Sequence, residues 1–241
     1  MNLFYHPAPT RDHILSHEEA HHCVKVLRMR KGDRIDIVDG LGGLYEAELT
    51  NDSVKNCEFE VISKRQVDAN SSAQIHIAIA PTKSPDRIEW FVEKVCELGI
   101  SKITFINTER TLRKHLKLDR LEKKTISALK QSKNLFKTEL QELQPYQEFL
   151  NGQFADAQKF IAHIDEEISV RLSEEAEVNK NYIVLIGPEG DFSSQEVSMA
   201  EDKGFVPVAL GNSVLRTETA GIIAAHTLKL INESSLFPNM K

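Results

Sequence analysis

Two short loops in the last quarter of the sequence combine residue types that could do chemistry. The first reads GPEGDFS over residues 187–193 and directly follows the apolar run 183–186. Ligands of open α/β sheets bind beyond the carboxyl ends of the strands, where glycines let the backbone approach closely. The loop lacks both the Gly-Lys-Ser/Thr of a P-loop and the G-x-G-x-x-G of a dinucleotide turn. A tight turn capped by Ser193 is the alternative, and the loop alone leaves both open.

The second loop reads LGNSVLRTETAG over residues 210–221 and places Arg216 and Glu218 just before a helix of small residues. An Arg two positions from a Glu at a protein surface is a plain ion pair of little consequence. Flanking apolar residues favour a partly buried pair with a functional role. Arg216 and Glu218 are therefore the first candidates for catalysis.

These loops belong to an alternation of strands and helices that begins near residue 73. Apolar runs at 75–80, 103–106, 160–162, 182–186 and 205–210 predict strands. Helices are predicted after Ser84-Pro85, over a long basic stretch at 110–137, from Ser193, and over 218–232. Continuous apolar strands between helices predict a mostly parallel sheet covered on both faces.

The first 70 residues predict a small β-rich domain. A helix at about 17–27 precedes three stretches of alternating apolar and polar residues at 35–38, 44–49 and 57–62, the pattern of half-buried strands. Three glycines between 40 and 43 predict the first turn, and the polar stretch 68–72 predicts a linker.

The composition is that of an ordinary globular protein, with 41% hydrophobic and 27% charged residues in 241. No apolar run reaches the ~18 residues of a membrane span, and the N-terminus lacks the layout of a signal peptide. We therefore expect a cytoplasmic protein with no membrane partner. Cys23, Cys57 and Cys96 are isolated, and no further ligand accompanies His21-His22, so we predict neither disulfides nor a metal site.

The net charge of −6 hides an asymmetry along the chain. Residues 1–70 contain 9 basic residues (Lys and Arg) and 12 acidic residues (Asp and Glu). Residues 71–137 contain 14 basic and 7 acidic residues, and residues 138–241 contain 7 basic and 17 acidic residues. A basic middle segment is typical of a protein with a polyanionic partner. A solvated helix face at 113–124 is the alternative that composition alone favours.

Five motifs in chain order resemble one enzyme family. They are H-x-x-x-V-L-R-x-x-x-G at 22–32, K-x-x-x-R-x-E-x-x-x-x-K-x-x-E-L-G at 83–99, Glu-Arg-Thr at 109–111, and the two loops. Together they resemble the ribosomal RNA small subunit methyltransferase E family of the SPOUT class. That family methylates N3 of a uridine in 16S ribosomal RNA with S-adenosylmethionine. The resemblance covers nearly the whole chain.

The resemblance implies an α/β fold with a PUA-like RNA-binding β-barrel over residues 1–70 and a SPOUT methyltransferase domain over residues 73–241, threaded into a trefoil knot. It implies a homodimer that acts on the small ribosomal subunit, and we expect the assembled subunit to be the substrate. The knot loops of the family hold the methyl donor. The positions carried over to this chain are Ile186, Gly187, Pro188, Glu189, Gly190, Leu210, Gly211, Ser213, Leu215 and Thr217.

Methylation at uridine N3 needs help because N3 carries a proton and attacks poorly until that proton leaves. We predict that Arg216 stabilises the developing uridine anion or orients the base. Glu218 is the second catalytic candidate, as base or as the residue that orients Arg216, and an acid interacting with the helix dipole is its alternative. RNA contacts are assigned to Arg28, Lys83, Arg87, Arg110, Arg113 and Lys133.

The sequence departs from the family pattern on the middle helix and in the first loop. Lys130 replaces an acid and Asn134 an Arg, so we assign no base contact there. Asp191 stands where a second Gly is common, which an ordinary backbone angle would accommodate. Two rival functions are a noncatalytic, ribosome-associated RNA-binding module with the knotted fold, and a nucleotide-dependent enzyme. The missing Lys and ribose-binding acid argue against the second rival.

Overall fold

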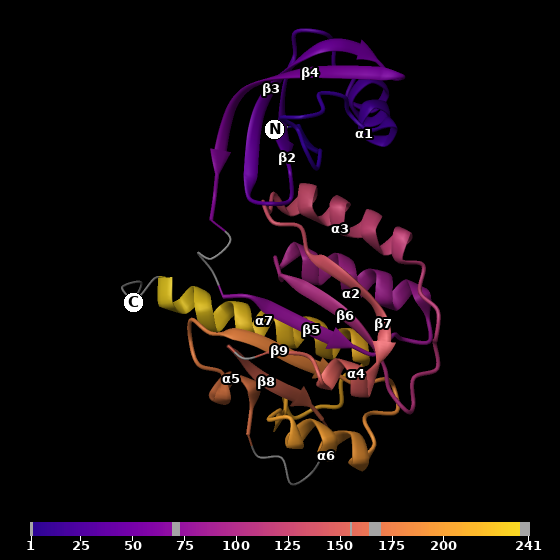
Figure 1. Ribbon diagram of the computed structural model, residues 1–241, viewed down its shortest axis with the longest axis vertical. Helices are drawn as coiled ribbons and strands as arrows, with labels where there is room; N and C mark the ends of the chain where they lie inside the picture. The colour runs from indigo at the N-terminus through magenta and orange to yellow at the C-terminus, as the bar shows by residue number, and fades with distance from the viewer. Residues whose placement is uncertain (1, 69–72, 155, 164–169, 237–241) are drawn as a thin grey trace. The chain divides into compact units, whose positions relative to one another are not determined.

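A computed structural model describes residues 2–68, 73–154, 156–163 and 170–236. The chain forms two compact units, Met1–Ser71 with Ile126–Lys137, and Ser72–Thr125 with Thr138–Lys241 (Figure 1). The predicted linker lies almost wholly outside the described residues. The domain boundary expected between residues 70 and 73 stays a prediction, and the first unit also contains residues 126–137, which that prediction places in the second domain.

The first unit is built on a four-stranded sheet in the order β1-β2-β3-β4. The three strands predicted by alternation are present and antiparallel, while the parallel strand β1 was not expected. Register shifts in β3 and β4 after Glu46 and Leu49 mark bulges, which bend a strand. The elements are β1 (Leu3–Tyr5), α1 (His17–His21), a π-helix η1 (His22–Val26), β2 (Arg34–Val38), β3 (Gly43–Ser53) and β4 (Asn56–Gln66).

A segment distant in sequence completes this unit. The turn between β2 and β3 bonds to it, with the Gly42 N–H donating to Leu135 O at 2.9 Å. Gly42 has φ +90°, and a Cβ there would lie 2.5 Å from Val67 O, so the position requires glycine. Lys130 Nζ lies 2.5 Å from Glu19 Oε1 on α1, and the two side chains are 23% and 7% exposed. A largely buried ion pair thus joins α1 to the segment 126–137.

The second unit contains a six-stranded sheet in the order β10-β8-β9-β5-β6-β7. Every neighbouring pair of strands is parallel, as the continuous apolar runs predict. The strands are β5 (Ile75–Ile79), β6 (Lys102–Asn107), β7 (Glu139–Pro145), β8 (Ala157–Ala162), β9 (Asn181–Ile186) and β10 (Val206–Val208).

Helices cover both faces of this sheet. One face forms a core in which Ile161 and Leu185 of the sheet pack with Phe149 of α4 and Ala200 of α6. On the other face α7 lies against β5 and β9, and Figure 1 shows it running along β5. The helices are α2 (Pro85–Glu97), α3 (Leu118–Ser132), α4 (Tyr146–Leu150), α5 (Leu172–Glu175), α6 (Ser194–Asp202) and α7 (Thr217–Leu236).

The contact between α2 and α7 depends on a small residue. A Cβ at Gly221 would lie 2.4 Å from the Phe91 ring, so a larger side chain would force the two helices apart. Gly221 therefore serves the packing of α7 against α2. The trefoil knot stays a prediction.

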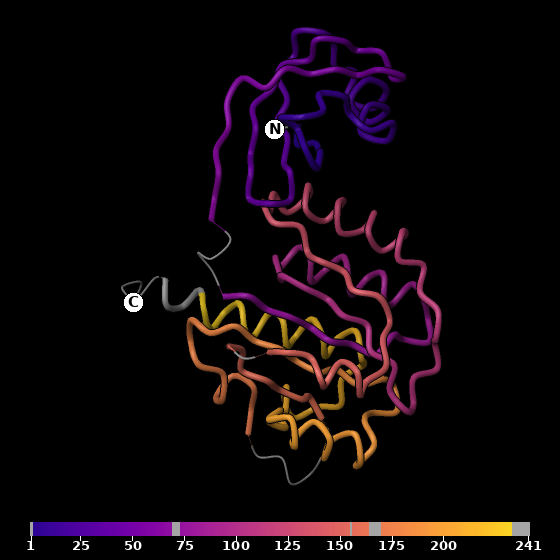
Figure 2. Tube along the Cα trace, viewed as in Figure 1, coloured from indigo at the N-terminus to yellow at the C-terminus, as the bar shows by residue number. Residues whose placement is uncertain are grey.

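Three details of the predicted elements need correction. Residues 110–117 of the basic stretch form an irregular segment between β6 and α3, which Figure 2 follows along the chain. The edge strand β7 was missed because its polar sequence, ELQELQP, lacks an apolar run. Ser84 is the N-cap of α2, but its side chain makes no capping hydrogen bond.

In the part of the chain that the structure describes, no helix is long and apolar enough to cross a membrane. The three cysteines are buried, and none of them is in a disulfide. Among the same residues, no group of three His, Cys, Asp or Glu side chains could hold a metal ion.

His76 on β5 is a half-buried histidine that stays neutral in the folded protein above about pH 3. Its Nε2 lies 2.7 Å from Thr104 Oγ1, and the ring contacts Phe149 and Phe154. Burial, with a smaller contribution from Lys102, lowers the pKa of His76 to about 3. Because a histidine in the unfolded chain has a pKa of about 6.5, the unfolded state binds the proton more readily below that pH.

We therefore expect His76 to lower the free energy of unfolding by about 1.4 kcal/mol per pH unit as the pH falls from 6.5 toward 3. Chemical denaturation at pH 6.5 and pH 5 measures this effect. The non-titrating variant His76→Gln should lose about 2 kcal/mol less than the wild type over that interval. An identical loss in both proteins would contradict the assignment.

Candidate functional site

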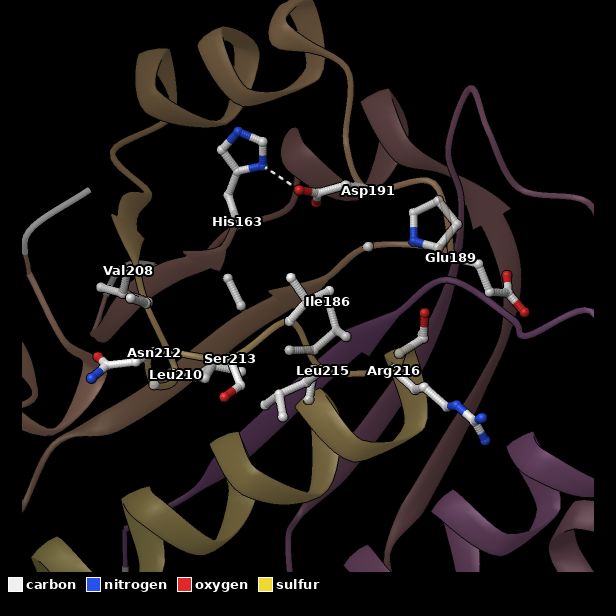
Figure 3. A pocket seen from close by; sticks show the side chains of 18 of the residues that line it. His163, Ile186, Glu189, Asp191, Val208, Leu210, Asn212, Ser213, Leu215 and Arg216 are labelled. Carbon is white, nitrogen blue, oxygen red and sulfur yellow. Dashed lines mark ion pairs between the residues drawn. The ribbon is translucent and has the colours of Figure 1, made fainter. Parts of the chain in front are cut away.

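A pocket of about 750 Å³ opens in the second unit at the carboxyl ends of β8, β9 and β10. These three strands are neighbours in the sheet, so the loops that follow them meet at one edge. Three segments supply most of the pocket lining: residues 162–163 at the end of β8, residues 186–189 with Asp191 after β9, and residues 208–217 with Ala220 from β10 into α7. Arg171 completes the lining. Figure 3 shows side chains from all three segments around one hollow.

The segment after β9 is a turn closed by its own side chains. Asp191 has φ +60°, and its Oδ1 accepts the Phe192 N–H at 2.8 Å. The Phe192 ring is buried in the core, and a Cβ at Gly187 would lie 3.1 Å from it. Ser193 then caps α6 in a capping box with Glu196. The backbone angle at Asp191 is therefore not the ordinary one that would accommodate any residue; Asp tolerates the left-handed region because its carboxylate bonds locally.

The segment after β8 contributes His163, which pairs with Asp191 across the pocket wall. His163 Nδ1 lies 2.8 Å from Asp191 Oδ2, and the two side chains are 15% and 24% exposed. The dashed line in Figure 3 marks this pair. This close contact joins two of the three pocket segments.

The segment after β10 supplies both apolar and polar residues to the pocket. Leu210 and Leu215 line the pocket together with Ile186 of β9 (Figure 3). Arg171 Nη2 donates to Asn212 Oδ1 at 3.1 Å, which fixes the outer part of the segment. Arg216 lines the pocket just before α7. The pocket thus offers an apolar interior with charged groups at its edges.

Glu218, in the first turn of α7, is buried. Its Oε1 lies 3.7 Å from Arg87 Nε on α2, and its side chain is 7% exposed. Its Oε2 accepts no hydrogen bond from any residue that the structure describes. Glu218 is not among the residues that line the pocket. The structure therefore places Glu218 beside Arg87, behind the pocket segment that carries Arg216.

Comparison with known proteins decides the family. A family model described as an RNA methyltransferase domain matches residues 69–229, and one described as an RNA methyltransferase PUA domain matches residues 15–62. The chain belongs to the RNA methyltransferase family. The resemblance noted from the sequence motifs is thereby confirmed, including the PUA domain at the N-terminus and the α/β methyltransferase domain that follows.

Relatives of this RNA methyltransferase match over most of their lengths. The ribosomal RNA small subunit methyltransferase E of Buchnera aphidicola is 27% identical, with 95% of this chain and 88% of that protein covered. A solved structure of a probable rRNA-methyltransferase from Porphyromonas gingivalis is 37% identical, with a TM-score of 0.92 over 98% of this chain and 100% of that chain. The enzyme from Neisseria gonorrhoeae, bound to S-adenosyl methionine, is 27% identical, with a TM-score of 0.86 over 96% of this chain and 98% of that chain.

The structure of this methyltransferase brings most of the predicted donor residues together. Gly190 does not line the pocket; its carbonyl accepts a hydrogen bond from Arg110 on the outside of the loop. The nine predicted residues that line the pocket are Ile186, Gly187, Pro188, Glu189, Leu210, Gly211, Ser213, Leu215 and Thr217.

The six predicted RNA contacts are divided between the two units. Arg28 and Lys133 are exposed in the first unit, and both have positive φ. Lys83, Arg110 and Arg113 lie in the second unit, in loops that bond to one another and to the segment after β9. Arg87, also in the second unit, pairs with Glu218. Their contact with RNA stays a prediction.

Sequence reasoning missed the part of the pocket contributed by the end of β8. His163 directly follows the predicted strand 160–162, and a strand end beside a motif-bearing loop is a signal that could have found it. Arg171 and Asn212 carry no motif that marks them. The pocket residues outside the predictions are Ala162, His163, Arg171, Asp191, Val208, Ala209, Asn212, Val214 and Ala220.

Proposed function

We propose that this methyltransferase transfers the methyl group of S-adenosylmethionine to N3 of a uridine in 16S ribosomal RNA, on the assembled small subunit in the cytoplasm. One observation carries the proposal: the two family motifs and the end of β8 enclose a single pocket of about 750 Å³ in an RNA methyltransferase. Similar structures from Neisseria gonorrhoeae and Legionella pneumophila are described with bound S-adenosyl methionine.

The pocket fits the chemistry of this donor. Its volume lies in the range of about 300–1,000 Å³ usual for small-molecule sites. Ile186, Leu210 and Leu215 offer an apolar wall for a flat nucleobase, and Glu189 and Asp191 offer carboxylates to a cationic molecule. When bound, S-adenosylmethionine supplies an electrophilic methyl group on a positively charged sulfur.

Arg216 is our first catalytic residue because it is the cation at the pocket edge nearest the start of α7 (Figure 3). A guanidinium held there stabilises the negative charge that develops on the uridine when N3 loses its proton. Glu218 is the second, as the base or as the residue that orients Arg216. Its buried Oε2 has a free lone pair among the described residues, and Arg87 offsets its charge.

The proposal includes a homodimer, the knotted C-terminal region, and an RNA-binding surface to which exposed Arg28 and Lys133 contribute. Exposed apolar side chains of the second unit, Val214 at 78% and Leu230 at 48%, support a subunit contact near the pocket segment and α7. RNA binding by such a surface should weaken steeply with salt despite the sequence pI of about 5.9.

Isothermal titration with S-adenosylmethionine, followed by transfer of labelled methyl to purified RNA, tests this function. We expect the free protein to bind the donor and to methylate assembled small subunits faster than naked 16S ribosomal RNA. Absence of donor binding in both the free protein and its complex with subunits would favour the noncatalytic RNA-binding module instead.

A further inference from the structure

Three loops on the outer side of the pocket are joined by hydrogen bonds. They follow β9, β5 and β6, which are neighbours in the sheet, so the loops leave the same edge side by side. We call residues 187–192 the donor loop. The loop after β5 carries Lys83, and the loop after β6 carries Arg110 and Arg113. The hydrogen bonds among these loops involve two of the arginines to which RNA contacts were assigned.

The Arg110 side chain contacts backbone carbonyls of the donor loop. Its Nη1 donates to Gly190 O at 2.6 Å and lies 3.5 Å from Phe192 O. A Cβ at Gly190 would lie 3.3 Å from Arg110 Cδ, so the side-chain stem also rests against the glycine. The two carbonyls flank Asp191, the residue with φ +60° that lines the pocket. A non-glycine residue in this region is strained and persists where its surroundings fix it.

Arg113 is connected to the donor loop through the backbone of Lys83. Its Nε and Nη2 both donate to Lys83 O, at 3.2 and 2.8 Å. The Lys83 N–H donates in turn to Glu189 Oε1 at 2.8 Å. The fork of Arg113 therefore holds the backbone of Lys83, the residue whose N–H binds the Glu189 carboxylate.

The loop that carries both arginines is itself rigid. Thr108 and Thr111 are buried, their hydroxyl oxygens are 2.8 Å apart, and the Thr108 N–H donates to Thr111 Oγ1 at 2.9 Å. The Glu109 N–H donates to Glu196 Oε1 at 2.8 Å, in the capping box that follows the donor loop. Arg110 thus projects from a turn that is anchored on both sides.

We propose that Arg110 and Arg113 are positioning residues that hold the donor loop in its binding shape before RNA arrives. Both side chains direct guanidinium N–H groups at backbone carbonyls of this chain. This proposal rests on the proposed function, because it takes the pocket to be the donor site. It replaces phosphate contact as the main role of these two arginines.

Measuring donor affinity in the absence of RNA distinguishes a residue that positions the donor loop from one that contacts RNA phosphates. For Arg110→Ala we expect the Kd for S-adenosylmethionine, measured by isothermal titration, to rise about tenfold, the scale of one net charge-assisted hydrogen bond. Affinity for small subunits and its dependence on salt should stay at wild-type values. An unchanged donor Kd would overturn the proposal. A salt slope lowered by about one would assign Arg110 to a phosphate.

Arg110→Lys sharpens the comparison and serves if Arg110→Ala fails to fold, which thermal unfolding would reveal. A lysine retains a phosphate contact as a point charge, but its Nζ lies one bond closer to the backbone than the Arg110 Nη1 that donates to Gly190 O. We therefore expect Arg110→Lys to lose donor affinity while it keeps RNA affinity; wild-type affinity for both would overturn the proposal.

The exposed Lys114, in the same basic segment, provides the matched control Lys114→Ala, which should bind donor like the wild type. If the wild type itself fails to bind the donor, the proposed function fails, whereas equal binding by wild type and Arg110→Ala rejects only the positioning role.

Discussion

Replacement of Arg216 by Ala is expected to lower the rate of methyl transfer by about 10²- to 10³-fold, the loss seen when one preorganised donor to a developing anion is removed. Arg216 lines the pocket, but its side chain is exposed, so the apolar wall should remain intact. We expect the Kd for the methyl donor to change by less than about threefold. Single-turnover transfer to small subunits measures the rate, and isothermal titration measures the affinity.

Arg216→Lys is the companion variant. It keeps the positive charge and loses the planar group that can orient a base, so it should recover part of the rate if charge stabilisation dominates. An Arg216→Ala variant that transfers methyl at the wild-type rate would remove Arg216 from the mechanism.

Replacement of Lys130 by Ala is expected to lower the free energy of unfolding by about 2 to 4 kcal/mol, because it leaves the Glu19 carboxylate buried without its cation. The Glu19 side chain is 7% exposed, and its Oε2 has no other partner among the residues that the structure describes. Lys130 itself is 23% exposed, which keeps the expected loss at the lower part of that range. Chemical denaturation provides the measurement.

A double variant isolates the pair. Glu19→Leu with Lys130→Met replaces both charges by apolar groups of similar size, and we expect it to be more stable than Lys130→Ala alone. A single variant Lys130→Ala within about 0.5 kcal/mol of the wild type would show that the pair contributes little. The ion pair also explains the departure from the family pattern at position 130. Lys130 stands where the resembled family has an acid, and it pairs with Glu19 of α1.

Periodic patterns predicted the parts of the fold that they directly encode. The buried strands β5 and β9 and the helix α2, with Ser84-Pro85 at its start, follow from apolar spacing and capping residues. The strand β7 does not, because it lies at a sheet edge and only Leu140 of its seven residues is buried. The association of residues 126–137 with the first unit depends on tertiary contacts that no local pattern contains.

The candidate site, like the fold, could be predicted only in part from the sequence. The motifs after β9 and β10 predicted two walls of the pocket, because short loops at strand ends carry their chemistry in consecutive residues. The positive φ of Asp191 and its contact with His163 were beyond prediction, since the contact forms only when β8 and β9 lie side by side. Arg110 and Arg113 appeared to be free cations in a basic segment, and only the structure shows their bonds to backbone carbonyls.

The most direct test of the proposed function is the identity of the methylated nucleoside. Small subunits from cells that lack this enzyme would be incubated with the protein and labelled S-adenosylmethionine, and the RNA would then be digested to nucleosides. We predict label in 3-methyluridine at one position of 16S ribosomal RNA. Label in any other nucleoside, or no label in RNA, would contradict the account.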